Sequence, residues 1–215
     1  MIEIYYRDRA PEYDDFYDIP ERQHDLTRLK SWLCDHGRGR TILEVAAGTG
    51  YWTEAVATVA KAIVATDYNP EMLAIAAKRS LGPHVLLRVA DGFALPEFAT
   101  TFDAGMAHMW WSHVAKERRQ EFLSHFVSRL QPRAAILMID QVFVEGRAGA
   151  VSREDQWGNL FTMRTLKSGA TYEIIKNYPG SAELQDDFTK LCDDVQIMLL
   201  PQFWALSARV RVRSD

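Results

Sequence analysis

The chain has 215 residues, and its 25 lysines and arginines against 29 aspartates and glutamates give a formal net charge of −4. Hydrophobic residues make up 47% and charged residues 25%, which excludes the disordered, collagen-like and low-complexity classes. The mild acidity disfavours nucleic acid as the main partner, so we expect a small-molecule ligand. The length suits one domain with layers on both sides of a sheet.

The cysteines and the N-terminus indicate a cytoplasmic protein. Cys34 and Cys192 form no disulfide framework or metal-ligand spacing, so no metal site is predicted. The first 20 residues are rich in charge and tyrosine, unlike a signal peptide, and no apolar run is long enough for a membrane span. Neither secretion nor membrane insertion is expected, and the oligomeric state stays open.

Along the first 140 residues, short apolar runs alternate with segments whose apolar residues recur at helical spacing. The predicted helices are 21–34, the segment after the turn at 46–50, the segment from Pro70, and 116–130. The predicted strands are 41–45, 62–66, 85–89, 102–107 and 134–139. This alternation is typical of a doubly wound α/β fold, in which a parallel sheet is covered on both faces.

The last third of the chain has a different pattern. Two runs of alternating polar and apolar residues, 161–166 and 171–178, flank Ser168-Gly169 and predict a β-hairpin. A helix at 182–192 and two strands at 195–200 and 203–212 are predicted to follow.

Polar or glycine residues follow each of the first three strands, at the edge where α/β sheets bind ligands. Gly48 and Gly50 allow a sharp turn and a close approach of the backbone to a ligand. Asp67 follows the second strand and can accept both hydroxyls of a ribose, and Asp91-Gly92 after the third can receive an exocyclic amine. Either aspartate could instead cap the next turn, but the ordered set predicts a nucleoside site.

The residues around the turn distinguish between nucleoside cofactors. A dinucleotide site needs a third glycine, whereas Gly50 is followed by Tyr51-Trp52-Thr53. Glu44 would repel a pyrophosphate and suits the ammonium of an amino acid. S-adenosylmethionine carries that ammonium and no phosphate, so it is the predicted cofactor.

These motifs, at 44–53, at Asp67 with 69–72, and at 91–92, resemble the ordered cofactor motifs of class I S-adenosylmethionine-dependent methyltransferases. The resemblance implies a Rossmann-like methyltransferase fold, with a mostly parallel seven-stranded sheet, an antiparallel last strand and an added β-hairpin. It implies one methyltransferase domain over 1–215. We expect it to comprise an N-terminal lid and helix at 1–40, a cofactor-binding half at 41–140, an acceptor-side hairpin at 141–180, and a final helix and strands at 181–215.

By this resemblance Glu44 would hold the methionine end of the cofactor, and Met72 would contact the adenine face. Alternatively, Glu44 pairs with an arginine and Met72 belongs to the core. Ala46 stands where the family often has a glycine, and we expect the loop to persist with slightly different dihedral angles. Residues 5–14 resemble a family lid over the sulfonium. The predicted cofactor-binding residues are Tyr13, Glu44, Ala46, Gly48, Gly50, Trp52, Asp67, Tyr68, Met72, Asp91, Gly92 and Ala107.

The fourth strand leads into a run of imidazoles and indoles, 108–113, where a methyl acceptor would lie. The Asn/Asp-Pro-Pro-Tyr sequence of enzymes that methylate nucleic-acid amines or protein amides is absent, which favours a small-molecule pocket. His108 and His113 are the candidate catalytic residues because histidine titrates near neutral pH, although either could merely brace the loop. Of Trp110 and Trp111, one is expected in the core and the other on the pocket wall.

The hairpin carries two cations. If Lys167 pairs with Thr171, then Arg164 faces Ile174 and Lys176 shares that face, which would make an anion site. With the run at 108–114, these residues resemble a narrower group that includes phosphonate O-methyltransferases, in which the corresponding arginine and lysine hold the phosphonate. Alternatively, the two charges belong to a solvated face of the hairpin.

The sequence therefore predicts methyl transfer from S-adenosylmethionine to a small molecule, at an oxygen of an acidic phosphonate or carboxylate. N-methylation or phenol O-methylation is the alternative within the class. A nicotinamide-dependent oxidoreductase and a catalytically silent nucleoside-binding protein are the alternatives outside it. The predicted acceptor-binding residues are Tyr17, His108, Trp110, Arg164 and Lys176.

Overall fold

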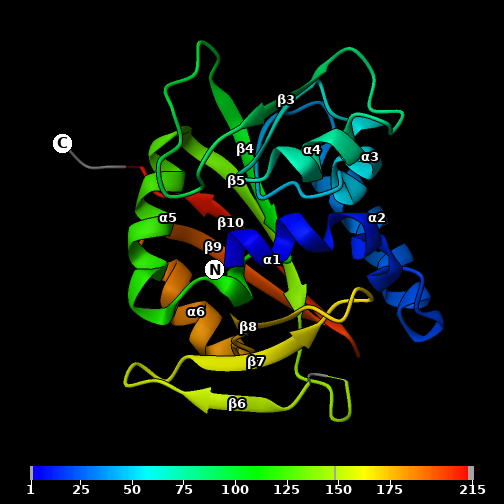
Figure 1. The fold of residues 1–215 in the computed structure, drawn as a ribbon. Helices are drawn as coiled ribbons and strands as arrows, with labels where there is room; N and C mark the ends of the chain where they lie inside the picture. Colours follow the sequence, from blue (N-terminus) through cyan, green and yellow to red (C-terminus); the bar gives the residue numbers. More distant parts are fainter. Residues whose placement is uncertain (1, 148, 213–215) are drawn as a thin grey trace.

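The computed structural model describes residues 2–147 and 149–212 (Figure 1). Residues 1, 148 and 213–215 of the predicted segments therefore lie outside the described ones. No helix in the described part of the chain is both long enough and apolar enough to cross a membrane.

A seven-stranded sheet in the order β3-β2-β1-β4-β5-β10-β9 forms the centre. The strands β1 to β5 are parallel, and β10 is antiparallel to both of its neighbours, as predicted. Most of β1, β2, β4 and β5 is buried, which explains their continuous apolar sequences. The strands are β1 (Thr41–Val45), β2 (Ala62–Asp67), β3 (Val85–Val89), β4 (Phe102–His108), β5 (Leu130–Gln141), β9 (Cys192–Leu199) and β10 (Phe203–Val210).

Helices cover both faces of this sheet (Figure 1). One core cluster includes Phe122 and Phe126 of α5 and Phe188 of α6. The cluster on the other face includes Leu29 of α2 and Val56 of α3. The helices are α2 (Gln23–Gly37), α3 (Tyr51–Ala57), α4 (Pro70–Ala76), α5 (Arg119–Ser128) and α6 (Ser181–Thr189).

Two predicted helices were too long at their C-terminal ends. The helix expected to reach Leu130 ends at Ser128, and Leu130 instead begins β5 by pairing with Phe102. The helix expected to reach Cys192 ends at Thr189, and Cys192 begins β9. Both residues are buried, so their apolar character fits either element and only the strand pairing decides between them.

The predicted hairpin is part of a separate three-stranded antiparallel sheet, β6-β7-β8. The hairpin itself is β7 (Leu160–Thr165) and β8 (Thr171–Ile175), and the unexpected strand is β6 (Val151–Glu154), whose four residues are all exposed. The predicted register was wrong, because Arg164 lies opposite Tyr172 rather than Ile174. The backbone N–H of Leu166 donates to the Ala170 carbonyl, so Thr171 pairs with Thr165 rather than with Lys167, two residues away from the predicted partner. A shift of two residues preserves the side-chain face.

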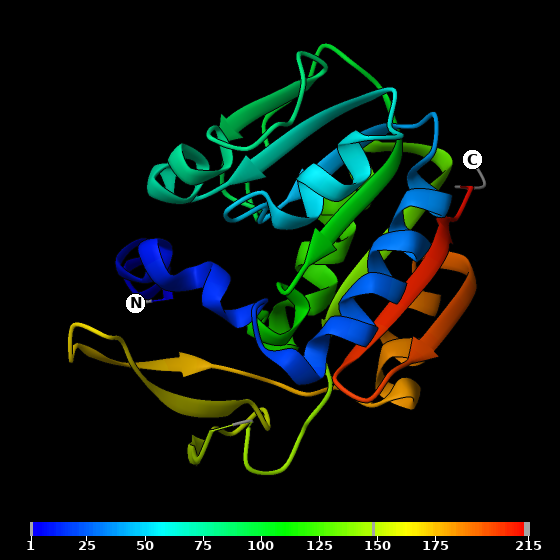
Figure 2. The same cartoon turned by 90° about the vertical axis from the view of Figure 1, so that its right-hand side faces the viewer.

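The N-terminal segment lies between the three-stranded sheet and the side of the molecule that carries α4 (Figure 2, blue). It comprises α1 (Ile2–Arg9) and two 3₁₀ segments, η1 (Ala10–Phe16) and η2 (Pro20–Arg22). On one side the Tyr172 hydroxyl donates to Asp8 over 2.5 Å. On the other, Asp14 accepts from Thr49 in the glycine turn and forms an ion pair with Arg79.

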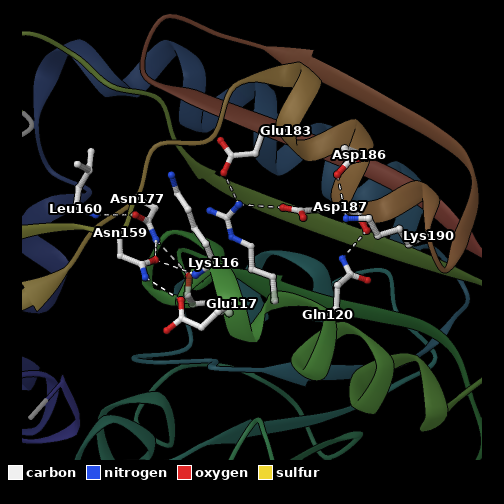
Figure 3. Close-up of polar contacts among 12 residues, drawn as sticks. Lys116, Glu117, Gln120, Asn159, Leu160, Asn177, Glu183, Asp186, Asp187 and Lys190 are labelled. Carbon is white, nitrogen blue, oxygen red and sulfur yellow. Dashed lines mark hydrogen bonds and ion pairs between the residues drawn. The ribbon is translucent and has the colours of Figure 1, made fainter. Parts of the chain in front are cut away.

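Buried asparagines connect the three-stranded sheet to the segment that follows β4 (Figure 3). The Asn159 side chain accepts from the Lys116 backbone N–H over 2.8 Å and donates to Glu117 over 2.8 Å. The Asn177 amide donates to the Asn159 side chain over 3.0 Å, and its backbone N–H donates to the Ser112 carbonyl over 2.7 Å. These contacts hold the end of β8 against the loop that follows β4.

Candidate functional site

The turn after β1 has the backbone conformation of a ligand-binding loop. Ala46, Gly48 and Gly50 have φ angles of 56°, 58° and 77°, in the left-handed region that favours glycine. The alanine at position 46 thus adopts the conformation that glycine prefers. At Gly50 an added Cβ would lie 2.9 Å from the Ala76 side chain, so α4 leaves no room there.

Asp67 supports this turn from the end of β2. Its Oδ2 accepts from the Gly48 backbone N–H and its Oδ1 from that of Asn69, both over 2.8 Å. Burial raises the pKa of the Asp67 carboxyl. The carboxylate therefore braces the turn, as the alternative held, and it also faces a cavity.

That cavity, of about 280 Å³, lies at the carboxyl ends of β1, β2 and β4 and is called the cofactor cavity below. It is lined by eight of the predicted cofactor residues: Tyr13, Ala46, Gly48, Asp67, Tyr68, Met72, Asp91 and Gly92. Met72 is 2% exposed, so it is a core residue that also faces the cavity. The backbone at Gly48 faces the cavity without a side chain, and two carboxylates at successive strand ends accompany it, so the residues fit a nucleoside with an amino-acid tail.

The other predicted cofactor residues lie outside the cavity lining. Gly50 packs against α4, and Ala107 and Trp52 belong to the core. Glu44 is 1% exposed and accepts a hydrogen bond from the Thr53 hydroxyl over 2.6 Å, so its partner is not the arginine of the alternative. Burial raises the pKa of Glu44 to about 8.

Four residues of the run 108–113 also line the cofactor cavity: His108, Met109, Trp110 and His113. Trp110 was predicted to contact the acceptor but lies beside Gly92 and Phe93, whereas Trp111 is buried in the core. His108 packs against Trp52, and both of its ring nitrogens lack a hydrogen-bond partner among the described residues. Burial lowers the pKa of His108 to about 3, so the ring is neutral.

A second cavity, of about 360 Å³, adjoins the first and is called the acceptor cavity below. Both cavities are lined by Tyr6, Tyr13, Met109 and His113, which therefore lie at their boundary. Arg164 and Lys176 line the acceptor cavity together, so the structure brings the predicted pair to one site.

The structure places Tyr17, a predicted acceptor-binding residue, in the core. Tyr17 lines neither cavity, because its ring stacks on Tyr51 at 3.6 Å and its hydroxyl accepts from the Trp52 indole over 3.1 Å. These contacts place it in the core cluster beside α3.

His113 is oriented by two partners at the boundary. The Ile175 carbonyl lies 2.7 Å from Nδ1 and can only accept, so Nδ1 carries the proton. Nε2 therefore accepts from the Tyr6 hydroxyl over 2.6 Å. Burial lowers the pKa of His113 well below its usual value, so this ring is also neutral.

Asp140 holds Lys176 in place. The Lys176 ammonium lies 2.6 Å from the Ser112 hydroxyl and 3.3 Å from the Asp140 carboxylate, and all three side chains are buried. Asp140 also accepts from the Ser112 backbone N–H over 2.8 Å. The sequence reasoning missed Asp140, although it follows the predicted fifth strand directly and the strand-end rule would have found it.

Comparisons with known proteins agree with this geometry. A family model described as a methyltransferase domain matches residues 42–133. The structure of DhpI in complex with SAH is similar over 97% of this chain and 95% of that one, with a TM-score of 0.80 and 28% identity. These matches support a class I S-adenosylmethionine-dependent methyltransferase. Its cofactor is S-adenosylmethionine, which replaces the nicotinamide alternative.

Two further matches bear on this methyltransferase. The DhpI–SAM–HEP complex is similar over 95% of this chain and 94% of that one, with a TM-score of 0.77 and 29% identity. A probable dimethyladenosine transferase of Caenorhabditis elegans is 32% identical over 107 residues, and this match spans 49% of the chain but only a third, 33%, of that relative. Together the comparisons support a methyltransferase of small molecules.

Proposed function

We propose that this methyltransferase transfers the methyl group of S-adenosylmethionine to an oxygen of a small acidic molecule, a phosphonate or a carboxylate. The observation that carries the proposal is the charge of the acceptor cavity. Among the described residues, six cationic side chains and two carboxylates line it. The cations are Arg9, Arg22, Arg147, Arg164, Lys167 and Lys176, and the carboxylates are Glu12 and Asp15.

An acceptor oxygen that is already ionised fits this site, because neither His108 nor His113 is placed to remove a proton from it. His108 is neutral with a pKa of about 3, and the Nε2 lone pair of His113 is occupied by the Tyr6 hydroxyl, so neither is placed as a strong base. A phosphonate or carboxylate oxygen is already an anion and has no proton to lose. It can attack the methyl carbon directly, and the carbon–sulfur bond breaks as the carbon–oxygen bond forms.

In this proposal the protein accelerates the reaction by positioning the acceptor oxygen and by keeping water away from it. Arg164 on β7 and Lys176 directly after β8 would hold the acidic group, and Tyr6 and Tyr13 at the boundary of the two cavities would shield the reacting oxygen from bulk water. Fixing the oxygen in line with the methyl group replaces a bimolecular encounter by an oriented one. The solved DhpI–SAM–HEP complex supports a site that holds the cofactor and a second molecule together, because that similar protein binds SAM and HEP in one complex.

The decisive experiment compares acceptors and two arginines of the three-stranded sheet. S-adenosylhomocysteine formation is measured with propylphosphonate, butyrate, a phenol and a primary amine. We expect turnover with an acid, and Arg164→Ala should lower kcat/KM for that acid about 10- to 100-fold without changing the affinity for S-adenosylhomocysteine. Arg164→Lys should restore only part, because an ammonium cannot make a two-point contact.

Arg153→Ala is the matched control, since Arg153 lies on β6 of the same sheet, pairs with Glu173 and does not line the acceptor cavity. Its turnover should equal that of the wild-type protein. If both Arg164 variants methylate the acid with wild-type efficiency, the cations are only a solvated face of the sheet. If the phenol or the amine alone is methylated, the acceptor is not acidic and the proposal is wrong.

A further inference from the structure

Arg22 is a buried guanidinium that has no carboxylate partner among the described residues. It is 5% exposed and lines the acceptor cavity from η2. Its Nη1 donates to the Phe16 carbonyl over 2.7 Å, and its guanidinium lies 3.8 Å from the centre of the Phe16 ring. Its Nε is buried without a hydrogen-bond partner within the described ranges. A buried charge without a counter-charge is costly, which indicates that an anion from outside the chain completes this site.

The groups around Arg22 add positive charge. Burial, followed by the charges of Arg147 and Arg9, lowers the pKa of Arg22 to about 10. Arg147 forms an ion pair with Glu21. Arg9 donates to the Tyr5 hydroxyl over 2.9 Å and, in the part of the chain that the structure describes, has no ion pair. The N-terminal wall of the cavity therefore carries two guanidinium groups that lack a carboxylate.

The facing wall is formed by the three-stranded sheet, which lies beside the N-terminal segment (Figure 2). Its cations differ in their partners, since Lys176 is paired with Asp140 and Lys167 with Asp15. Arg164 and Lys176 on this wall are the pair that the proposed function assigns to the acidic group being methylated. Arg22 and Arg9 belong to other elements of the chain, and that assignment leaves their charge unused.

We propose that Arg22, with Arg9 beside it, forms a second anion-binding position in the acceptor cavity, so that the acceptor is a small molecule with two acidic groups. This inference rests on the proposed function, in which the first acidic group binds Arg164 and Lys176. A guanidinium can hold two oxygens of a carboxylate or phosphonate at once. The substrate class is thus a short-chain phosphonocarboxylate or dicarboxylate.

The test compares two acceptors that differ in one acidic group, propylphosphonate and 3-phosphonopropionate. For the wild-type protein we expect kcat/KM to be about 10- to 100-fold higher for the diacid. Arg22→Met should lower kcat/KM for the diacid to about the value for propylphosphonate, so that the preference disappears, while Arg164→Ala should weaken both acceptors. Equal rates for the two acceptors with the wild-type protein would overturn the inference, as would an equal loss of both in Arg22→Met. Arg9→Met is the second variant should Arg22→Met fail to fold.

Arg28→Met is the control, because Arg28 is an exposed arginine of α2, six residues after Arg22 in the chain. It should behave as the wild-type protein with both acceptors. A second readout separates this inference from the proposed function: thermal unfolding of the protein saturated with S-adenosylhomocysteine, with and without inorganic phosphate. Phosphate should raise the Tm of the wild-type protein more than that of Arg22→Met, and an equal rise refutes the second position. A larger rise in the wild-type protein without methylation of either phosphonate would leave the second position supported and refute the proposed function.

Discussion

Asp67→Asn is the perturbation that tests the cofactor cavity most directly. The carboxylate is 8% exposed, and each oxygen accepts one backbone N–H, from Gly48 and Asn69. Asparagine keeps one acceptor oxygen and turns an NH₂ group toward the other N–H, so one hydrogen bond to a charged group is lost. Such bonds contribute about 1.5–3 kcal/mol, so part of the turn is destabilised. A ribose hydroxyl bound to the same carboxylate loses its charged acceptor at the same time.

We therefore expect Asp67→Asn to bind S-adenosylhomocysteine about 1.5–3 kcal/mol more weakly, roughly 10- to 150-fold in Kd, by isothermal titration calorimetry. Its Tm should fall by about 2–4 °C for each kcal/mol of lost stability. Asp103→Asn is the matched control. Asp103 lies near the start of β4, away from the cofactor cavity, and it also accepts a backbone N–H, that of Thr41, over 2.8 Å. Wild-type affinity in Asp67→Asn, or the same loss of affinity in Asp103→Asn, would refute the assignment of the ribose to Asp67.

Three further predictions follow from burial. Glu44 ionises near 4.5 when unfolded and at about 8 when folded, so the unfolding free energy of the wild-type protein should fall as pH rises from 5 to 8, by at most about 1.4 kcal/mol per pH unit. Urea denaturation of Glu44→Gln should show a flatter dependence over that range, and an identical slope would mean that Glu44 is already ionised. His108→Gln should retain turnover of an acidic acceptor within about tenfold and leave the pH–rate profile unchanged, because the ring is neutral; loss of turnover would instead identify His108 as a base. Gly50→Ala should lower the Tm by several degrees in calorimetry, since its Cβ would lie 2.9 Å from the Ala76 side chain at a φ of 77°, and an unchanged Tm would show that α4 can move.

The sequence by itself determined the parallel sheet and the strand-end site. Buried parallel strands leave continuous apolar runs such as 62–66, and parallel strands bring their carboxyl ends to one edge. Asp67, Asp91 and Gly48 could therefore be assigned to one cavity without a structure. The prediction that Arg164 and Lys176 share one face of the hairpin held although the register was wrong. Side chains alternate with a period of two residues, and the register differs by two.

The tertiary structure alone decided where the cavities begin and end. Tyr6 and His113 are 107 residues apart in the chain but hydrogen-bonded at the boundary, and no local pattern encodes such a contact. Tyr17 is an amphipathic side chain of the kind that often lines pockets, but it packs into the core. The residues of β6 are all exposed, so no pattern of buried apolar residues marks this strand in the sequence. Arg22 reads as an ordinary surface arginine in the sequence, yet packing of the N-terminal segment buries its charge. The burial of a side chain and the pairing of distant residues depend on which segments of the chain come together. The cavity boundary, the position of Tyr17 and the burial of Arg22 therefore follow only from the tertiary structure.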